Sequence, residues 1–160
     1  VDAIVADLNT KRHKLHIAIE NWQHDLNIGS IVRTANAFNV SGVHIVGKRD
    51  WNKRGAMVTD RYLSVHYHPT VREFAIWCEE NDLPIIGIDN VPGSLQLESA
   101  QLPEKCVLLF GQEGAGMSEE GIAACENLYE INQYGSTRSM NASAAGAIAM
   151  YHWALQHLPK

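Results

Sequence analysis

Short apolar runs alternate along this chain with longer segments in which apolar residues recur every three or four positions. The runs lie at 15–20 (LHIAIE), 43–46 (VHIV), 84–88 (PIIGI), 106–110 (CVLLF) and 128–131 (LYEI). A run without polar alternation is typical of a strand that is covered on both faces of its sheet. We therefore predict five strands, most of them buried.

Three longer segments carry apolar residues at helical spacing. They span about 27–39, 70–81 and 140–158, and one stripe of the last carries Ala144, Ile148, Tyr151 and Leu155. Strands that alternate with helices indicate an α/β domain with a mainly parallel sheet, flanked by helices and joined by right-handed crossovers. In such sheets ligands bind at the carboxyl ends of the strands.

Length and composition fit one domain over 1–160. A chain of 160 residues that is 46% hydrophobic and 19% charged is neither disordered, collagen-like nor a coiled coil. No apolar run approaches the roughly 18 residues that cross a bilayer, and no signal-peptide pattern opens the chain, so we expect no membrane partner. Three widely spaced cysteines predict neither a disulfide framework nor a Cys-x-x-Cys metal site. We expect a cytoplasmic protein without a metal.

The net charge of −5 argues mildly against a nucleic-acid partner, but it hides an asymmetry. Residues 1–60 carry a net charge of +2 and residues 61–160 one of −7. Basic residues cluster at 11–14 and again at Lys48, Arg49, Lys53 and Arg54. Such clusters are usually solvated surface. Trp51, inside the second cluster, raises the chance of contact with RNA.

A glycine-rich loop follows the strand at 106–110. Three glycines in six positions, beginning with Gly111, permit a ligand to approach the main chain, although a simple strand-to-helix connector has the same composition. Ser118 is predicted to be the N-cap of a helix. The loop has neither Walker nor GxGxxG spacing. Glu113 favours a ligand site, because a carboxylate among glycines has no evident packing role.

A second polar segment, 135–143, opens the last helix. Its run of Ser136, Ser139, Asn141 and Ser143 suits ligand binding at free backbone N–H groups, although Ser139 or Asn141 can simply cap the helix. Small residues at 142–147 are better explained by tight packing than by a ligand.

Two further features are weaker. Arg33, between Val32 and Ala35, suits recognition of a phosphate or carboxylate, although an ordinary surface arginine fits as well. His66 and His68 lie on one face of an extended segment, and we favour solvated histidines over a metal site because no third ligand is suitably spaced.

Three segments resemble motifs 1, 2 and 3 of the TrmH-like branch of the SPOUT RNA methyltransferases. They are NIGSIVRTANAFNVSGVHIVG, LLFGQEGAGMSEE and INQYGSTRSMNASAAGAIAMYHWALQ, in the family's order and with its internal spacing. The resemblance runs from about 15 to 156. It implies a trefoil-knotted α/β fold, a homodimer, and methyl transfer from S-adenosylmethionine to a ribose 2′-hydroxyl of tRNA or rRNA.

The resemblance also implies roles for individual residues. Catalysis falls to Asn27, Arg33, Glu113, Ser139 and Asn141, and cofactor binding to Asp89, Gly111, Ile131, Ser139 and Met140. The basic residues Lys48, Arg49, Lys53 and Arg54 are the expected RNA contacts. The chain departs from the family at Gln112, often Asn, and at Asn132, often Pro. Two alternatives remain, another nucleotide-using α/β domain such as a flavodoxin-like protein, and an RNA-binding module that has lost catalysis.

Overall fold

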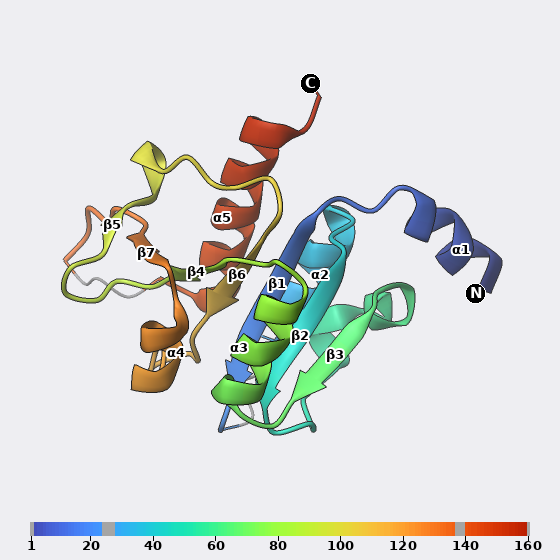
Figure 1. Cartoon of the computed structure of the whole chain (residues 1–160), viewed down its shortest axis with the longest axis horizontal. Coiled ribbons are helices and arrows are strands. Elements are labelled where there is room, and N and C mark those ends of the chain that lie inside the picture. Colours follow the sequence, from blue (N-terminus) through green and yellow to red (C-terminus); the bar gives the residue numbers. More distant parts are fainter. Residues whose placement is uncertain (1, 24–27, 137–139, 160) are drawn as a thin grey trace.

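A parallel β-sheet organises the computed structural model, which describes residues 2–23, 28–136 and 140–159 (Figure 1). The sheet has seven strands in the order β3-β2-β1-β6-β4-β7-β5, and every neighbouring pair is parallel. The strands are β1 (Leu15–Asn21), β2 (Gly42–Gly47), β3 (Val65–His68), β4 (Ile85–Ile88), β5 (Leu95–Gln96), β6 (Cys106–Phe110) and β7 (Asn127–Glu130). The predicted α/β class and parallel sheet are confirmed.

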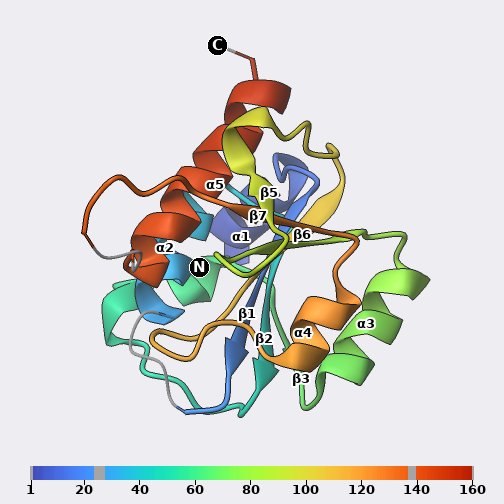
Figure 2. The same cartoon turned by 90° about the vertical axis from the view of Figure 1, so that its left-hand side faces the viewer.

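Helices cover both faces of the sheet (Figure 2). The α-helices are α1 (Asp2–Thr10), α2 (Ile28–Ala37), α3 (Val71–Glu80), α4 (Glu119–Ala124) and α5 (Ala142–His157). Three short 3₁₀ turns are η1 (Arg54–Ala56), η2 (Thr59–Tyr62) and η3 (Leu97–Ser99). The helices α2 and α5 pack together on one face, and α3 and α4 on the other. The sequence pattern placed the three long helices to within two residues.

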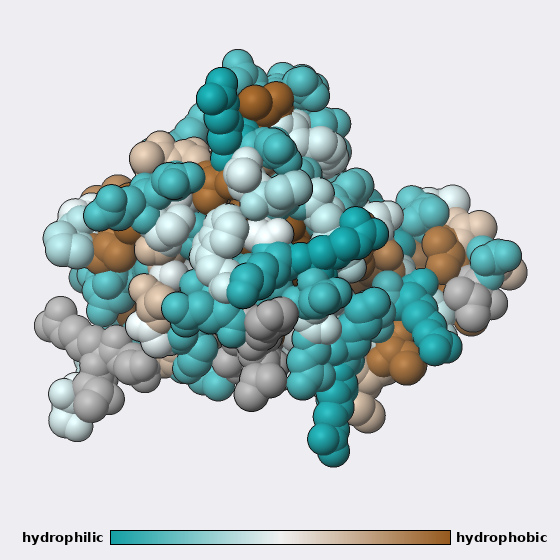
Figure 3. Space-filling model, turned by 90° about the horizontal axis from the view of Figure 1, so that it is seen from below, coloured by the Kyte–Doolittle hydropathy of each residue, from teal (hydrophilic) through white to brown (hydrophobic). Residues whose placement is uncertain are grey.

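The strands β1, β2 and β3 end at the bottom of Figure 1, and Figure 3 shows that side of the molecule from below as a mostly hydrophilic surface. Among residues 2–23, 28–136 and 140–159, no helix has the length and apolar character of a membrane span.

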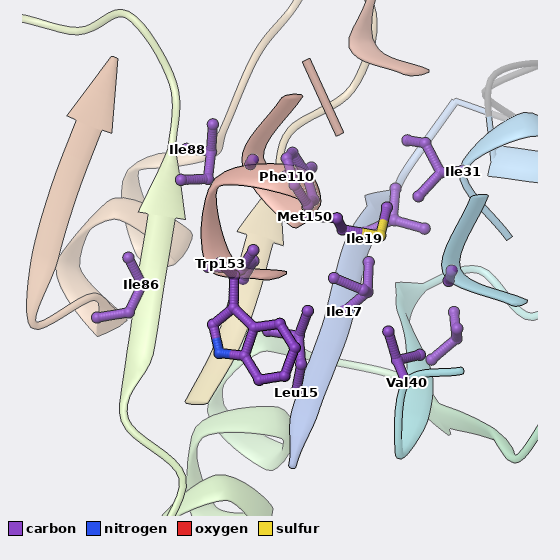
Figure 4. Packing of buried hydrophobic residues seen from close by; sticks show 14 of the residues in the cluster. Leu15, Ile17, Ile19, Ile31, Val40, Ile86, Ile88, Phe110, Met150 and Trp153 are labelled. Carbon is purple, nitrogen blue, oxygen red and sulfur yellow. The ribbon is translucent and has the colours of Figure 1, made fainter. Parts of the chain in front are cut away.

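The larger part of the core lies between the sheet and α5 (Figure 4). Trp153 is 1% exposed and packs beside Leu15, and its indole Nε1 donates to the carbonyls of Pro103 and Glu104, both at 3.2 Å. The remaining buried positions of α5 are Gly146, Ala149, Met150 and Ala154. The stripe of Ala144, Ile148, Tyr151 and Leu155 lies instead on the exposed side of the helix.

Candidate active site

A cavity of about 380 Å³ opens where β4, β6 and β7 end. These strands are neighbours in the sheet, so the loops that follow them meet at one edge, as expected for a parallel α/β sheet. The start of α5 closes the cavity. Its lining includes Asp89 and Asn90 after β4, the loop 111–117 after β6, Ile131 and Gln133 after β7, and Met140, Ala142 and Ala145.

The glycine-rich loop after β6 folds back on itself. The backbone N–H of Gly116 donates to the carbonyl of Gln112 at 2.8 Å, and the N–H of Gln112 donates to Gly116 at 3.1 Å. A Cβ atom on Gly111 would lie 2.2 Å from the carbonyl carbon of Gly116, so no side chain fits there. Gly116 itself has a φ of +71°, which favours glycine. The loop is therefore a fixed turn, not a loose connector.

Asp89 holds this turn from the β4 side. Its Oδ2 accepts from the backbone N–H of Met117 at 2.9 Å, and its Oδ1 from that of Asn90 at 2.8 Å. These two bonds fix the carboxylate in the cavity lining.

Glu20 holds the same turn from the β1 side. This carboxylate is fully buried, and it accepts from the backbone N–H of Ser118 at 2.7 Å and from its hydroxyl at 2.5 Å. The Ser118 oxygen in turn accepts from the N–H of Gly121 at 3.0 Å, which confirms Ser118 as the N-cap of α4. Glu20 was not among the predicted site residues. The one available signal was a charged residue at the end of an apolar strand.

Gln112 connects the turn to the chain that leaves β1. Its Oε1 accepts from the backbone N–H groups of Trp22 and Gln23, both at 2.7 Å, and the residue is 8% exposed. The side chain that departs from the resembled family therefore has a structural task, because it positions the segment that leads toward motif 1.

Glu113 reaches from the turn to the start of α5. Its Oε2 accepts from the backbone N–H of Ala142 at 3.0 Å. Asn141 is the N-cap of this helix, and its Oδ1 accepts from the N–H groups of Ser143 at 2.8 Å and Ala144 at 3.3 Å. The capping alternative is thus confirmed for Asn141. The two side chains meet at one helix end beside the cavity.

The predicted site residues fall into three groups. Asp89, Gly111, Glu113, Ile131 and Met140 line the cavity, and Asn141 stands next to it. Arg33 is exposed on α2 and is not part of the lining. The predictions for Asn27 and Ser139 lie outside the described residues.

The basic cluster lies where β2 ends. The guanidinium carbon of Arg49 is 4.1 Å from the ring centre of Tyr67, and Lys53 Nζ is 5.6 Å from that of Trp51 and 3.9 Å from Asp60 Oδ2. Trp51 is only 8% exposed because it packs into the core. A buried indole is not available to stack on a base, so the structure does not favour stacking of Trp51 on RNA bases.

His68 of β3 belongs to a hydrogen-bonded chain of buried and partly buried imidazoles. His16 Nδ1 lies 3.0 Å from His44 Nε2, and His44 Nδ1 lies 2.9 Å from His68 Nε2. Burial lowers the pKa of His16 to about 4 and that of His44 to about 2, and the neighbouring histidines add to both shifts. His68 is 7% exposed, so the expectation of a solvated histidine is wrong there.

The fold and the cavity define a parallel α/β protein with a cavity at the carboxyl ends of its strands. The sequence profile of the SpoU rRNA Methylase family matches residues 14–151. This chain belongs to that family, which confirms the resemblance to the TrmH-like RNA methyltransferases.

Two known relatives are consistent with this family assignment. The tRNA (guanosine(18)-2′-O)-methyltransferase of Borreliella burgdorferi is 28% identical over 148 residues, covering 90% of this chain and 67% of that protein. The SpoU methyltransferase AviRb of Streptomyces viridochromogenes superimposes with a TM-score of 0.82 at 25% identity, over 92% of this chain and 61% of AviRb. The chain thus spans about two thirds of these two relatives.

A third comparison is with a chain of similar length. A solved structure described as structural insights into the 2-OH methylation of C/U34 on tRNA gives a TM-score of 0.75 at 25% identity. The match covers 90% of this chain and 96% of that chain.

Proposed function

We propose that this chain transfers a methyl group from S-adenosylmethionine to a ribose 2′-hydroxyl of tRNA or rRNA. One observation carries the proposal: in a member of the SpoU family, the cavity lies between the loops of motifs 2 and 3, at the start of α5. The Borreliella relative is by name a tRNA 2′-O-methyltransferase, and AviRb has been solved in complex with the cofactor AdoMet.

The cavity suits this cofactor. Its volume of about 380 Å³ lies in the range of roughly 300–1,000 Å³ that small-molecule sites occupy. The carboxylates of Asp89 and Glu113 complement a positive ligand, and Ile88, Phe110 and Met140 give apolar walls. S-adenosylmethionine, when bound, supplies a methyl group that its sulfonium has already activated. The proposed binding residues are Asp89, Gly111, Ile131, Ser139 and Met140, within a trefoil knot formed by this part of the chain.

Arg33 is the proposed residue beside the ribose. A guanidinium is in general a poor base near neutral pH, so its task is to bind the target phosphate next to the 2′-hydroxyl. The phosphate can then take or relay the hydroxyl proton. Asn27, Glu113, Ser139 and Asn141 would fix Arg33 and the ribose. The hydrogen bond from the Ala142 N–H to Glu113 supports a shared role for Glu113 and Asn141, because it brings the motif 2 loop to the helix that Asn141 caps.

The proposed assembly is a homodimer in which residues 1–160 of each subunit form one domain. Its support is an exposed apolar stripe on α5, formed by Ala144, Ile148, Tyr151 and Leu155. Two subunits would set the basic cluster of one, Lys48, Arg49, Lys53 and Arg54, beside the cavity of the other. Three free cysteines among the described residues agree with the cytoplasmic location that we propose.

Methyl transfer is tested with purified protein, S-adenosylmethionine labelled on its methyl group, and bulk tRNA or rRNA. Label must enter the RNA, and nuclease digestion must recover it on a ribose 2′-oxygen. RNA binding without any transfer of label would instead identify an RNA-binding module that has lost catalysis.

Arg33→Ala tests the proposed role of the guanidinium. The variant should lose methyl transfer and retain cofactor affinity, measured by calorimetry. Arg72→Ala is the matched control, since Arg72 is also an exposed arginine on a helix, and its helix α3 lies on the opposite face of the sheet. Full activity in Arg33→Ala would refute the role.

A further inference from the structure

The connection between η1 and η2 holds two consecutive residues in a backbone conformation that their side chains disfavour. Met57 has a φ of +52° and Val58 a φ of +61°, and neither is glycine. The left-handed region is especially unfavourable for a β-branched residue such as valine. Both side chains are nevertheless exposed, Met57 by 60% and Val58 by 54%. The turn therefore presents two apolar groups to solvent in a strained conformation.

The residues on either side of Met57 and Val58 are held in place, which maintains the strained backbone conformation. Ala56, directly before the pair, is fully buried against α2, where a Cβ on Gly29 would lie 2.9 Å from the Ala56 nitrogen. The hydroxyl of Thr59 donates to the Ala56 carbonyl at 2.5 Å, and Arg12 Nη2 donates to the carbonyl of Tyr62 at 2.6 Å. Strain that the surrounding structure enforces on an exposed turn is characteristic of a functional site.

The charge around the pair is opposite to that of the whole chain. Residues 48–61 contain five basic and two acidic side chains, a net charge of +3, whereas the chain carries −5. Lys53, Arg54 and Arg61, on either side of Met57 and Val58, are exposed.

The turn also connects two short helices that pack against α2, the helix that carries the residue proposed to bind the target phosphate. Gly29, which contacts η1, and Arg33 are four positions apart on α2, so they point to the same side of that helix. An RNA strand that meets Arg33 would pass over the η1–η2 turn.

We propose that Met57 and Val58 form the contact for an unstacked base in a single-stranded stretch of the RNA substrate. The inference rests on the proposed function and specifies the kind of RNA that it takes. A base offers an apolar face to the two side chains while its phosphates meet Lys53, Arg54 and Arg61. A second copy of the chain fits less well, because a two-fold contact here would bring like charges together.

The test compares two double variants of the full chain. Met57→Ser with Val58→Gly removes both apolar side chains and relieves the strain at position 58. Ile76→Ser with Asp82→Gly is matched, since Ile76 is 46% exposed on α3 and Asp82 has a φ of +54°. The probe is a fluorescein-labelled, mixed-sequence single-stranded RNA of about 20 nucleotides, a length that exceeds one typical binding site. Fluorescence anisotropy gives the RNA affinity, calorimetry the cofactor affinity, and thermal unfolding the stability.

We expect the Met57/Val58 variant to bind this RNA about five- to tenfold more weakly, the loss expected when one or two apolar contacts disappear. Its unfolding temperature should not fall and its cofactor affinity should not change, whereas the control variant should match the wild type in RNA affinity. Removal of the Asp82 charge can only favour RNA binding, so it cannot mimic the effect.

Equal RNA affinity in the Met57/Val58 variant and the wild type would overturn the proposal. So would a shift in sedimentation equilibrium without a loss of RNA affinity, which would assign the turn to self-association. The result is separable from the proposed function. A wild type that transfers no methyl group but shows the contrast in RNA affinity refutes the reaction and leaves the contact standing.

Discussion

Two carboxylates from different strands hold two consecutive backbone N–H groups beside the cavity. Asp89 accepts from Met117 and Glu20 accepts from Ser118. Since β6 lies between β1 and β4 in the sheet, the turn after β6 is fixed on both sides by its neighbours. The position of the cavity wall thus depends on a buried residue outside the lining.

Glu20→Gln should weaken both the fold and the proposed cofactor site. The Ser118 backbone N–H and hydroxyl both donate to Glu20, whereas the NH₂ group of glutamine cannot accept a hydrogen bond. At least one of these two donors would therefore lose its acceptor, which should lower the free energy of unfolding by about 1.5–3 kcal/mol. For a chain of this size we expect a fall in unfolding temperature of about 4–10 °C, measured by circular dichroism. Calorimetry should show weaker binding of S-adenosylmethionine.

Glu119→Gln is the control for Glu20→Gln, because Glu119 is exposed one residue after Ser118. It should leave both quantities close to those of the wild type. A Glu20→Gln protein that is destabilised yet binds the cofactor normally would contradict the argued link between this carboxylate and the cavity.

The sequence predicted most cavity residues but not the network behind them. Asp89 and Gly111 directly follow predicted strands and Ile131 ends one, so the rule for parallel sheets and the motif resemblance both found them. Glu20 was missed because its partner Ser118 is 98 positions away, and no local pattern reports such a contact. The same holds for Gln112, whose bonds reach back to the end of β1.

At the scale of elements, the start of α5 combines a structural and a proposed catalytic task. Asn141 caps the helix through two backbone N–H groups, and Thr70 caps α3 in the ordinary way by accepting from Glu73. Helix caps contribute similar amounts to stability regardless of function.

Asn141→Ala and Thr70→Ala should therefore cost similar stability, about 1 kcal/mol each, measured by urea unfolding. They should differ in activity. Asn141→Ala should lose most methyl transfer, since its amide would also fix the ribose, whereas Thr70→Ala should keep it. Equal activity in the two variants at equal stability would remove Asn141 from the proposed catalytic group.

The strands β1, β2 and β3 share a row of buried and partly buried imidazoles that links stability to pH. His16, His44 and His68 form the hydrogen-bonded chain, and His66 stacks on His44 with ring centres 4.7 Å apart. The rings face Phe74 and Trp77 of α3. Burial lowers the pKa of all four histidines, and Lys105 contributes to the shift at His16.

Acidification should destabilise the fold. Below a pH of about 6.5 the unfolded chain binds protons at these histidines that the folded chain rejects, so the free energy of unfolding falls as pH falls. For His16 the loss continues to a pH of about 4, its pKa in the folded protein. Each such histidine adds a slope of up to about 1.4 kcal/mol per pH unit.

Urea unfolding between pH 8 and pH 5 measures this slope. His16→Asn keeps a polar group near the position of Nδ1 and removes one titrating site, so its slope should be shallower than that of the wild type. A free energy of unfolding that stays constant from pH 7 to pH 5 would contradict the assignment of neutral, buried histidines.

Some elements were beyond the sequence pattern for definable reasons. Strand β5 has only two residues, and helix α1 buries none of its residues. Neither element therefore shows a hydrophobic period that the sequence could reveal. The run of β3 contains two histidines and reads as polar, yet its His68 is buried. In α5 small and apolar residues surround the helix, so the pattern predicted a helix without showing which side is buried.

At the scale of the whole molecule, the exposed side of α5 carries the apolar stripe on which the proposed dimer rests. Its 16 residues include no Lys, Arg, Asp or Glu, although the outer side of a surface helix is normally charged. Ile148, Tyr151 and Leu155 are 42%, 57% and 50% exposed, at spacings of three and four residues. An isologous contact between two copies would bury this stripe on both.

Ile148→Glu with Leu155→Glu should convert the proposed dimer to a monomer. A two-fold contact brings each new carboxylate close to its symmetry mate or into apolar surroundings, so every substitution acts twice. Sedimentation equilibrium should give twice the chain mass for the wild type and the single mass for the variant.

Ile76→Glu, on the exposed side of α3, is the control and should leave the dimer intact. A wild-type protein that is monomeric at about 100 μM, far above the Kd of a stable dimer, would show that the stripe serves another partner. If the basic cluster acts across the interface, the double variant should also lose methyl transfer while its cofactor affinity remains.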